Sequence, residues 1–546
     1  LGEALSYSVN AYYRRISTRT SNGDINDEAL TESVYQPGAA ERAALAGAGH
    51  SGFPASGANA ANTPFPSWRC IANVLLNDEP NEKCNGLVNR TATLQHNLGI
   101  TAQVSASPTL AGLEHRLLFG VGVDANRVRF AQSAQFGYVN LDRTVTPVNG
   151  PGAFADGSQE SENAFDARVD IASRAHTVSV FASDTVTLNP RTHLTFSGRY
   201  NRHRVSTDDA LAPGGGPGSL DGRHRFARFN PALGLSFAPT AGFTLYAGAN
   251  QGSRAPSAVE LGCADPLTPC KLPNSFAGDP PLKQVVTTTL EAGLRGSVPG
   301  RLAWNLGVFR SDNRDDLLFV SDNTSGFGYF RNFGKTRRQG LEAGLSVHPA
   351  RDWTLGANLS LLDATWRSAE RLGGSANSSN DAAAAGLPGL PGSIEIRAGD
   401  RIPLLPRRVL KLFADWDVTR QWGLGADLVA SSGATARGNE NGAHVPDGVF
   451  YTGPGRSAGY AVLNMNVDYR PSARLKLFVQ VNNLLDRRYA SAAQLGANAF
   501  DANGNFIARP LPPAANGEYP LRHGSFLAPG APRGVWLGLR YAFGDA

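Results

Sequence analysis

The chain has 546 residues, of which 51 are Lys or Arg and 46 are Asp or Glu, so its formal net charge is only +5. This balance, together with the lack of basic clusters interleaved with aromatic residues, argues against a nucleic-acid-binding protein. Charged residues make up 18% of the chain, below the roughly 25% that is usual in soluble domains, whereas 61 glycines and 34 prolines indicate many turns and loops.

No run of about 18 apolar residues is present, so the sequence contains no candidate transmembrane helix. It begins at Leu1 without a signal peptide, and Met465 is its only methionine. We therefore expect a further segment upstream, which is either a cleaved leader or a larger part of the protein.

Apolar and polar residues alternate with a period of two in runs along the whole chain, as they do in β-strands. After Pro349, for example, one face carries Leu355 and Leu359. The opposite face carries Asn358 and Ser360. We predict about 16 strands, at residues 6–19, 89–104, 112–132, 174–188, 191–206, 223–238, 242–256, 284–297, 301–320, 328–348, 352–368, 405–418, 421–437, 457–470, 473–490 and 533–543.

The connections between these runs are alternately short and long. The long segments, rich in Gly, Ala, Asn, Pro and Ser, are 21–88, 134–165, 207–222, 259–283, 369–404, 438–456 and 492–530. Outer-membrane barrels have this arrangement, with tight turns in the periplasm and long loops outside. A soluble sandwich or propeller would need a second packed layer and shorter loops. The fold expected is all-β, a transmembrane antiparallel up-and-down β-barrel.

The four cysteines form two close pairs within predicted loops, Cys70 with Cys84 and Cys263 with Cys270. This spacing predicts two local disulfides and an oxidising compartment. Free thiols are the alternative. A zinc site is less favoured, because no Cys-x-x-Cys motif or histidine pair lies beside them.

Motifs that resemble catalytic signatures lie in the wrong context. The sequence GRSAG at 455–459 fits a nucleophile elbow, but it precedes a predicted strand instead of joining a strand to a helix. No group of His, Asp and Glu suggests a metal or catalytic site, so we expect neither an enzyme nor a bound cofactor. Arg199 and Arg540, predicted to face the barrel interior, would either meet an anionic solute or form ion pairs within the wall.

The segment VNNLLDRRYA at 481–490 resembles the penultimate-strand signature of TonB-dependent outer-membrane receptors. In that family, Asn-Leu-(Phe/Leu)-Asp-x-x-Tyr precedes a last long loop and a terminal strand that ends in an aromatic residue. The matching positions here are Asn483, Leu484, Asp486 and Tyr489, with Phe543 as the terminal aromatic.

Three more segments are similar to family motifs and occur in the family's order. They are GSRAPSAVEL at 252–261 with Arg254, Ala255 and Pro256, then DPPLKQVVTTTLEAGL at 279–294, then NFGKTRRQGLEAGL at 332–345 with Gly340, Leu341 and Glu342. The resemblance covers most of the chain from about residue 225. The chain departs from the family pattern at Ser253, usually aromatic, at Asp279, usually Asn, and in the three residues after Phe543.

The resemblance implies a 22-stranded barrel around an N-terminal plug. Nothing in the sequence resembles the plug or the segment that contacts TonB. We therefore expect residues 1–546 to be one β-barrel domain, truncated at its N-terminus, that lacks the plug and about six strands.

The resemblance implies active import of a scarce nutrient, most often a ferric siderophore, across the Gram-negative outer membrane. TonB would be the partner that supplies the energy, acting on the plug. The expected surroundings are outer-membrane lipid and an iron chelate at the loops, with a monomeric receptor. The aromatic residues that would contact the ligand, or would instead anchor the barrel at the membrane interface, are Trp68, Phe327, Tyr329 and Tyr451. No histidine lies between Arg254 and Pro281, which disfavours a haem receptor.

The main alternative is a plugless 16-stranded passive porin, which fits the predicted strand number but not the receptor motifs or the long first loop. An outer-membrane hydrolase would need a Ser, His and acid set that converges on one point. An adhesin would need repeated binding modules, and the sequence shows neither feature.

Overall fold

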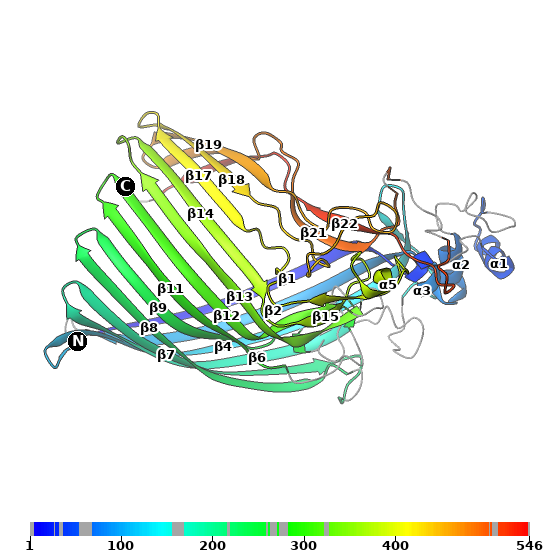
Figure 1. Ribbon diagram of the computed structural model, residues 1–546, viewed down its shortest axis with the longest axis horizontal. Coiled ribbons are helices and arrows are strands. Elements are labelled where there is room, and N and C mark those ends of the chain that lie inside the picture. The colour runs from blue at the N-terminus through cyan, green and yellow to red at the C-terminus, as the bar shows by residue number, and fades with distance from the viewer. Residues whose placement is uncertain are drawn as a thin grey trace.

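The computed structural model describes residues 5–26, 28–31, 37–53, 68–154, 169–215, 219–257, 260–261, 270–271, 282–321, 327–501, 503–504 and 512–543. It is dominated by one curved antiparallel sheet of 19 strands, three of which are short: β3 (Thr109–Leu110), β5 (Val145–Pro147) and β10 (Cys270–Lys271) (Figure 1). The others are β1 (Leu5–Ile25), β2 (Gly86–Ala106), β4 (Leu113–Val139), β6 (Val169–Asn189), β7 (Thr192–Asp209), β8 (Gly222–Thr240), β9 (Phe243–Arg254), β11 (Val285–Val298), β12 (Leu302–Ser321), β13 (Phe327–Val347), β14 (Trp353–Trp366), β17 (Arg408–Asp417), β18 (Trp422–Ser431), β19 (Tyr460–Ser472), β20 (Leu475–Asn482) and β23 (Gly534–Tyr541). They match the predicted strands in order, which confirms the all-β fold.

Each long strand pairs with the next long strand in the chain, as an up-and-down barrel requires. β1 and β2, for example, pair from Leu5 opposite Ala106 to Ile25 opposite Gly86. Among the described residues, β1 pairs only with β2 and β23 only with β20, so these two strands form the edges of the sheet. Both chain termini lie at the same end of the sheet (Figure 1).

Short turns join the strands at that end, and long connections join them at the other. Gly242 and Gly300 lie in two of the short turns with φ of +84° and +70°. A side chain would strain the backbone in this left-handed region, which explains why the turns contain glycine. The long connections extend from the opposite end, where the helices also lie (Figure 1).

The long segments contain more regular structure than the sequence predicts. The predicted loop 21–88 is wrong in part, because it contains the end of β1, the start of β2 and four helices: η1 (Glu28–Thr31), α1 (Ala39–Gly47), α2 (Trp68–Leu76) and α3 (Pro80–Lys83). Two hairpins occur in later loops, β15 (Glu370–Gly373) with β16 (Ser393–Ile396), and β21 (Ala490–Ala497) with β22 (His523–Pro529), besides the short helix α5 (Asp381–Ala384). Within the described chain, no helix is both long enough and apolar enough to span a membrane.

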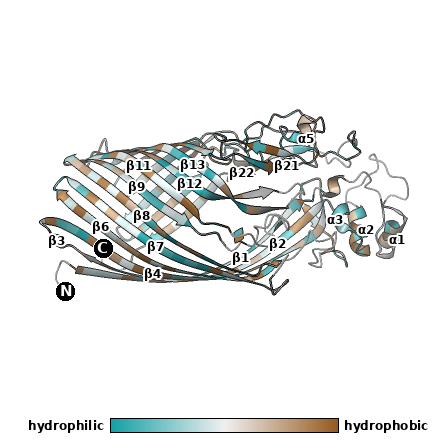
Figure 2. Ribbon diagram, turned by 60° about the horizontal axis from the view of Figure 1, so that its bottom comes forward, coloured by the Kyte–Doolittle hydropathy of each residue, from teal (hydrophilic) through white to brown (hydrophobic). Residues whose placement is uncertain are grey.

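Hydrophilic and hydrophobic residues alternate along the strands (Figure 2), so the two faces of the sheet differ in polarity. On β4, Phe119, Val121 and Val123 point outward and are 42–52% exposed. Between them, Gly120 and Gly122 belong to the inner face. So many exposed apolar side chains would be costly in water, which indicates that the outer face contacts lipid.

Aromatic pairs lie at the short-turn end of the sheet. Trp353 stacks on Trp416 with ring centroids 5.0 Å apart, and Trp422 stacks on Tyr469 at 4.5 Å. Rings with one apolar and one polar part favour the boundary between lipid and water. Their place next to the turns corresponds to one of the two aromatic girdles of an outer-membrane barrel.

The helical segment between β1 and β2 has its own small core. Leu45 of α1, Ile71 and Val74 of α2 and Phe136 of β4 are buried together. Cys70 and Cys84 form a disulfide within it, which confirms that pairing. Cys263 and the side chain of Cys270 lie outside the described residues, so the second predicted disulfide stays a prediction.

Replacing Cys70 and Cys84 with serine is expected to destabilise this helical segment by about 3 kcal/mol, because the bond closes a loop of roughly 15 residues. The measurement is the rate of amide hydrogen exchange in α2, with β18 as an internal reference. Equal exchange rates in α2 with and without the disulfide would contradict the prediction.

Candidate functional site

The candidate site is the polar inner face of the sheet together with the loops at its long-loop end. On this face Arg199 of β7 lies 5.1 Å from the ring centroid of Phe181 on β6. Its guanidinium donates hydrogen bonds to Ser179 Oγ at 2.8 Å and to Asn201 Oδ1 at 2.9 Å. Among the described residues Arg199 has no carboxylate partner, so its charge faces the interior without neutralisation.

The packing of Phe181 depends on a glycine in the neighbouring strand. Gly120 lies directly opposite Phe181, and a Cβ atom at Gly120 would be 2.2 Å from the Phe181 ring. The ring therefore covers the bare backbone of β4, an arrangement by which aromatic side chains compensate for glycine in sheets. Through this contact Phe181 provides a flat surface for the Arg199 guanidinium.

A second charged group lies on the inner face near the short turns. Asp468, whose side chain is 9% exposed, forms ion pairs with Arg470 at 2.8 Å and Lys476 at 3.2 Å. Arg540 is opposite Lys476 in the register of β20 and β23. The basic partners of Asp468 and the neighbouring Arg540 line a cavity of about 550 Å³ together with Arg420.

At the long-loop end, three connections pack together into a structure that we call the loop layer, comprising 367–407, 432–459 and the described residues of 483–533. Tyr451 lies at its centre and is 1% exposed. Its hydroxyl oxygen accepts hydrogen bonds from Asn380 Nδ2 and from the backbone N–H of Gly389, both at 3.0 Å. Tyr451 thereby joins the second of these connections to the first.

Two histidines flank Tyr451. His523 of β22 stacks on its ring at 5.8 Å, and His444 meets it edge-on at 6.2 Å. Burial lowers the pKa of His523 to about 4, an effect that the backbone of Gly389 opposes and His444 reinforces. Both imidazoles therefore lie in a desolvated environment, since burial also lowers the pKa of His444.

The loop layer also contacts the first connections of the chain. Leu30 of η1, Val139 of β4 and Phe500 of the last connection are buried in one cluster. The Arg143 guanidinium lies 5.1 Å from the Phe500 ring. The first and last loops thus contact each other on the side of the molecule where the two edge strands, β1 and β23, are not paired.

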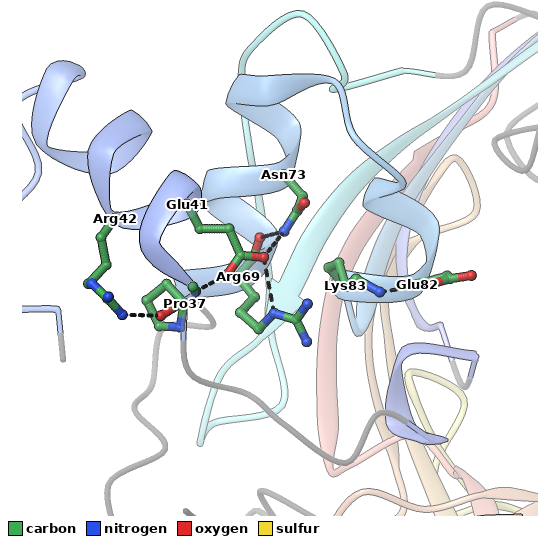
Figure 3. Close-up of polar contacts among 8 residues, drawn as sticks. Pro37, Glu41, Arg42, Arg69, Asn73, Glu82 and Lys83 are labelled. Carbon is green, nitrogen blue, oxygen red and sulfur yellow. Dashed lines mark hydrogen bonds and ion pairs between the residues drawn. The ribbon is translucent and has the colours of Figure 1, made fainter. Parts of the chain in front are cut away.

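A buried carboxylate fixes α1 onto α2 (Figure 3). Glu41 Oε1 accepts hydrogen bonds from Arg69 Nε at 3.1 Å and Asn73 Nδ2 at 2.6 Å, while Oε2 accepts one from the backbone N–H of Gly38. Glu41 is 9% exposed. Because buried charges must be paired and hydrogen-bonded, these three donors explain why a carboxylate is tolerated there.

Replacing Glu41 with glutamine should weaken the docking of α1 by about 1–3 kcal/mol, because the amide has only one acceptor oxygen for the three donors. Hydrogen exchange in α1 would measure the effect. The matched control is Glu82→Gln, which removes an ion pair with Lys83 from a more exposed side chain and should cost under about 1 kcal/mol. Equal effects of the two substitutions would contradict the assigned role.

Of the four aromatic residues predicted to contact a ligand, the structure describes the side chains of Trp68 and Tyr451, and each packs against other rings of the chain. Trp68 is half-buried and packs its ring against those of His50 and Phe53 at 6.1 and 5.9 Å. The side chains of Phe327 and Tyr329 lie outside the described residues. Tyr451, predicted to contact the ligand or to anchor the barrel, is 1% exposed and bonded to Asn380 and Gly389 inside the loop layer.

The signature residues that carry the family resemblance have structural partners. Asn483 is 2% exposed and has φ of +52°. Its amide donates to the carbonyls of Arg487 and Ala531, both at 3.0 Å, and its Oδ1 accepts from the Arg487 N–H at 2.8 Å. Asp486 Oδ1 accepts from the Arg533 N–H at 3.0 Å. The signature therefore builds the turn that ends β20, which is why the predicted strand 473–490 already stops at Asn482.

The other signature residues lie on strands of the wall or pack against them. Arg254 forms a two-pronged contact with Glu260, with N–O distances of 2.7 and 2.9 Å. Glu342 lies on the inner face of β13, between Gly307 and Ser360 of the neighbouring strands. Tyr489 packs against Tyr460 with centroids 4.4 Å apart. Within the described part of the chain, no three His, Cys, Asp or Glu side chains are grouped as metal ligands would be.

Residues 3–484 match the model of a protein family described as "TonB dependent receptor-like, beta-barrel". The chain belongs to this family. As a TonB-dependent receptor barrel it is a protein of the Gram-negative outer membrane, and its family is one of receptors, not of enzymes.

Two curated relatives of this receptor barrel are siderophore receptors by name. The chain is 22% identical over 441 residues to the probable TonB-dependent siderophore receptor PiuA of Acinetobacter baumannii, covering 77% of this chain and 52% of PiuA. It is 25% identical over 356 residues to the ferric enterobactin receptor of Pseudomonas aeruginosa, covering 61% of this chain and 40% of that receptor. The chain thus spans about half the length of the curated relatives it matches.

Solved structures show the same fold. The crystal structure of PiuA from Acinetobacter baumannii superposes with a TM-score of 0.55 at 13% identity, covering 84% of this chain and 62% of that one. The unliganded ferric citrate transporter FecA gives a TM-score of 0.51 at 16% identity, covering 83% and 55%. Sequence reasoning foresaw this receptor-barrel fold but missed the Glu41 group and the central position of Tyr451, because both depend on contacts between loops far apart in sequence.

Proposed function

We propose that the protein containing this barrel imports a ferric siderophore across the outer membrane in an energy-dependent step driven through TonB. The observation that carries the proposal is the match of residues 3–484 to the receptor-barrel family, with two curated relatives that are siderophore receptors by name. The open polar inner face beneath a folded loop layer is compatible with a large hydrophilic cargo.

In this proposal the loops capture the chelate and the inner face guides it. Arg199 is suited to an anionic cargo because its guanidinium has no carboxylate partner among the described residues. The guanidinium is held in place by the Phe181 ring and by its hydrogen bonds. Trp68, Phe327 and Tyr329 remain proposed contacts. Tyr451 acts instead by holding the loop layer in shape.

Several further properties belong to the same proposal. Residues 1–546 would form the barrel domain of a longer, monomeric receptor whose plug contacts the TonB complex, and the six further strands of a 22-stranded barrel would lie between β23 and β1. Such a receptor catalyses no reaction on its cargo and needs no cofactor. A passive porin would share the polar interior but would transport without energy.

The test is uptake of ⁵⁵Fe by iron-starved cells that express the complete receptor, offered one ferric siderophore at a time. We expect saturable uptake of at least one chelate, abolished by an uncoupler or by deletion of TonB. Uptake that persists after either treatment would support the porin and overturn active import. No uptake of any iron chelate, from a receptor shown to be at the cell surface, would overturn the siderophore assignment.

For the inner face, Arg199→Gln is expected to raise the half-saturating concentration of an anionic chelate about tenfold, the loss that follows from one charge-assisted hydrogen bond. The matched control is Arg191→Gln in the short turn between β6 and β7, which is exposed and remote from the loops. A cargo without net negative charge should show no such difference. If the two variants behave alike with an anionic cargo, Arg199 has no role in guiding it.

A further inference from the structure

One histidine ring joins two connections of the loop layer. His444, which is 7% exposed, lies in the connection 432–459, and its Nδ1 atom accepts a hydrogen bond from the backbone N–H of Ser378 at 3.2 Å. Ser378 belongs to the connection 367–407 and is 66 positions away in the chain. On the other side of the ring, Nε2 lies 3.3 Å from the carbonyl oxygen of Gly453. The imidazole therefore bridges two backbone groups that come from different loops.

These two partners determine the protonation state of the ring. A backbone N–H only donates and a carbonyl oxygen only accepts, so Nδ1 must be the acceptor and Nε2 must carry the proton. Both bonds exist together only in this neutral tautomer. A second proton, on Nδ1, would place a ring N–H against the N–H of Ser378. The bond between the two loops would then be lost, and a partly buried backbone donor would be left without its acceptor.

The surroundings of the ring do not compensate for a positive charge. Tyr451 meets the ring edge-on with centroids 6.2 Å apart, and the nearby His523 is itself cationic when protonated. Asp447 is the acidic group whose charge acts on His444, but its Oδ1 already accepts the backbone N–H groups of Val449 and Tyr451. The cost of desolvation exceeds the attraction of Asp447 and the effect of the Gly453 carbonyl, so the pKa of His444 lies below its ordinary value of 6.5.

A small set of hydrogen bonds surrounds this contact, and we call residues 377–379 and 438–445 together the loop joint. Asn377, which is fully buried, donates through Nδ2 to the carbonyl oxygen of Gly438 at 2.9 Å and to Asn441 Oδ1 at 3.1 Å. The backbone N–H of Val445 donates to Ser378 Oγ at 2.8 Å. The other side chains that bond across the joint are amides and hydroxyls, whereas an imidazole changes its charge at mildly acidic pH.

We propose that the loop joint is a proton-sensitive latch, in which protonation of His444 separates residues 377–379 from residues 438–445 and loosens the loop layer. Above pH 6.5 the ring is neutral whether the joint is closed or open, so the proton has no effect. As the pH falls below 6.5 the open joint takes up the proton first, which shifts the equilibrium toward opening. The latch depends on contacts within the loops and is independent of the cargo. Combined with the proposed function, it would make capture by the loops depend on the external pH.

The test is amide hydrogen exchange of residues 375–380 in the complete receptor at pH 7.5 and pH 5.5, corrected for intrinsic exchange and referred to β18. All proteins carry His523→Phe, so that the second imidazole does not contribute. We expect this segment to exchange about tenfold faster at pH 5.5, as one pH unit below the ordinary pKa of histidine allows. His444→Asn retains an acceptor oxygen near the position of Nδ1 but cannot be protonated, so its exchange should change less than twofold.

His444→Gln is a second neutral variant, because its amide can also accept from Ser378 and donate to Gly453. It decides the test if His444→Asn already exchanges fast at pH 7.5. His348→Gln, at an exposed turn at the opposite end, is the matched control and should show the full pH response. Glu440 is present in every variant, so its opposite contribution cancels in the comparison. Equal pH responses with and without the imidazole at position 444 would overturn the latch, as would unchanged exchange at pH 5.5 in the protein that retains His444.

Discussion

Replacing Tyr451 with alanine is expected to destabilise the loop layer by about 3–5 kcal/mol, the largest effect of any single substitution considered for this chain. The ring is fully buried, and its removal leaves a cavity between His444 and His523. It also leaves the Gly389 N–H without its acceptor and removes one acceptor of Asn380 Nδ2, which still donates to the Asn377 carbonyl at 2.9 Å. Hydrogen exchange across 432–459 measures the change.

Tyr451→Phe separates the two contributions, since it keeps the ring and removes only the acceptor. Its cost should be about 1–3 kcal/mol. Tyr200→Phe is the control, because that side chain lies on the outer face and is 45% exposed. If Tyr451 acts through loop packing, transport should fall in the same order as the stability of the loop layer, least in Tyr200→Phe and most in Tyr451→Ala. A Tyr451→Phe variant with normal exchange but lost ligand binding would show instead that the hydroxyl contacts the cargo.

Acidification is expected to weaken the loop layer by about 3 kcal/mol between pH 6.5 and pH 4 through His523 alone. Burial lowers the pKa of His523 to about 4, below its ordinary value of 6.5. Above pH 6.5 the imidazole is neutral in both states and costs nothing. As the pH falls below 6.5 the unfolded state takes up the proton first, so stability decreases until the folded pKa is reached. The decrease is about 1.4 kcal/mol per pH unit.

The measurement is hydrogen exchange of β22 and of residues 450–453 as a function of pH, corrected for intrinsic exchange. His523→Phe preserves the stack on Tyr451 and should remove this part of the pH dependence. Glu440, whose pKa is raised by burial, contributes with the opposite sign in both proteins, so their difference isolates His523. His348→Gln at an exposed turn is the control. Parallel pH profiles of wild type and His523→Phe would contradict the prediction.

The strands were predictable from the sequence because each strand has one face in lipid and the other in water. Lipid outside and water inside impose opposite demands on successive residues, so β14 displays Leu355 and Leu359 on one face and Asn358 and Ser360 on the other. This signal is local and repeats in every strand. The tight turns were equally visible, since Gly242 and Gly300 occupy positions where a side chain would strain the backbone.

Less of the candidate site was predictable. The inward direction of Arg199 follows from strand parity, and the Cys70–Cys84 disulfide follows from spacing. The burial of Tyr451 does not, because it arises from contacts with residues 62 and 71 positions away in the chain. The helices between β1 and β2 were missed because they are short, and their stability comes from the core around Leu45 and Phe136 instead of from a long periodic pattern.

The sequence alone determined the antiparallel strands, their order, their inner and outer faces and the family to which the barrel belongs, because those properties depend on residues within a few positions of each other. Tertiary structure alone decided which loops join, which aromatic residues are buried and where charges meet. Arg127 and Arg174 are 47 positions apart, and only the pairing of β4 with β6 places their charges opposite each other. Contacts of that kind depend on the register between strands, which no local pattern specifies.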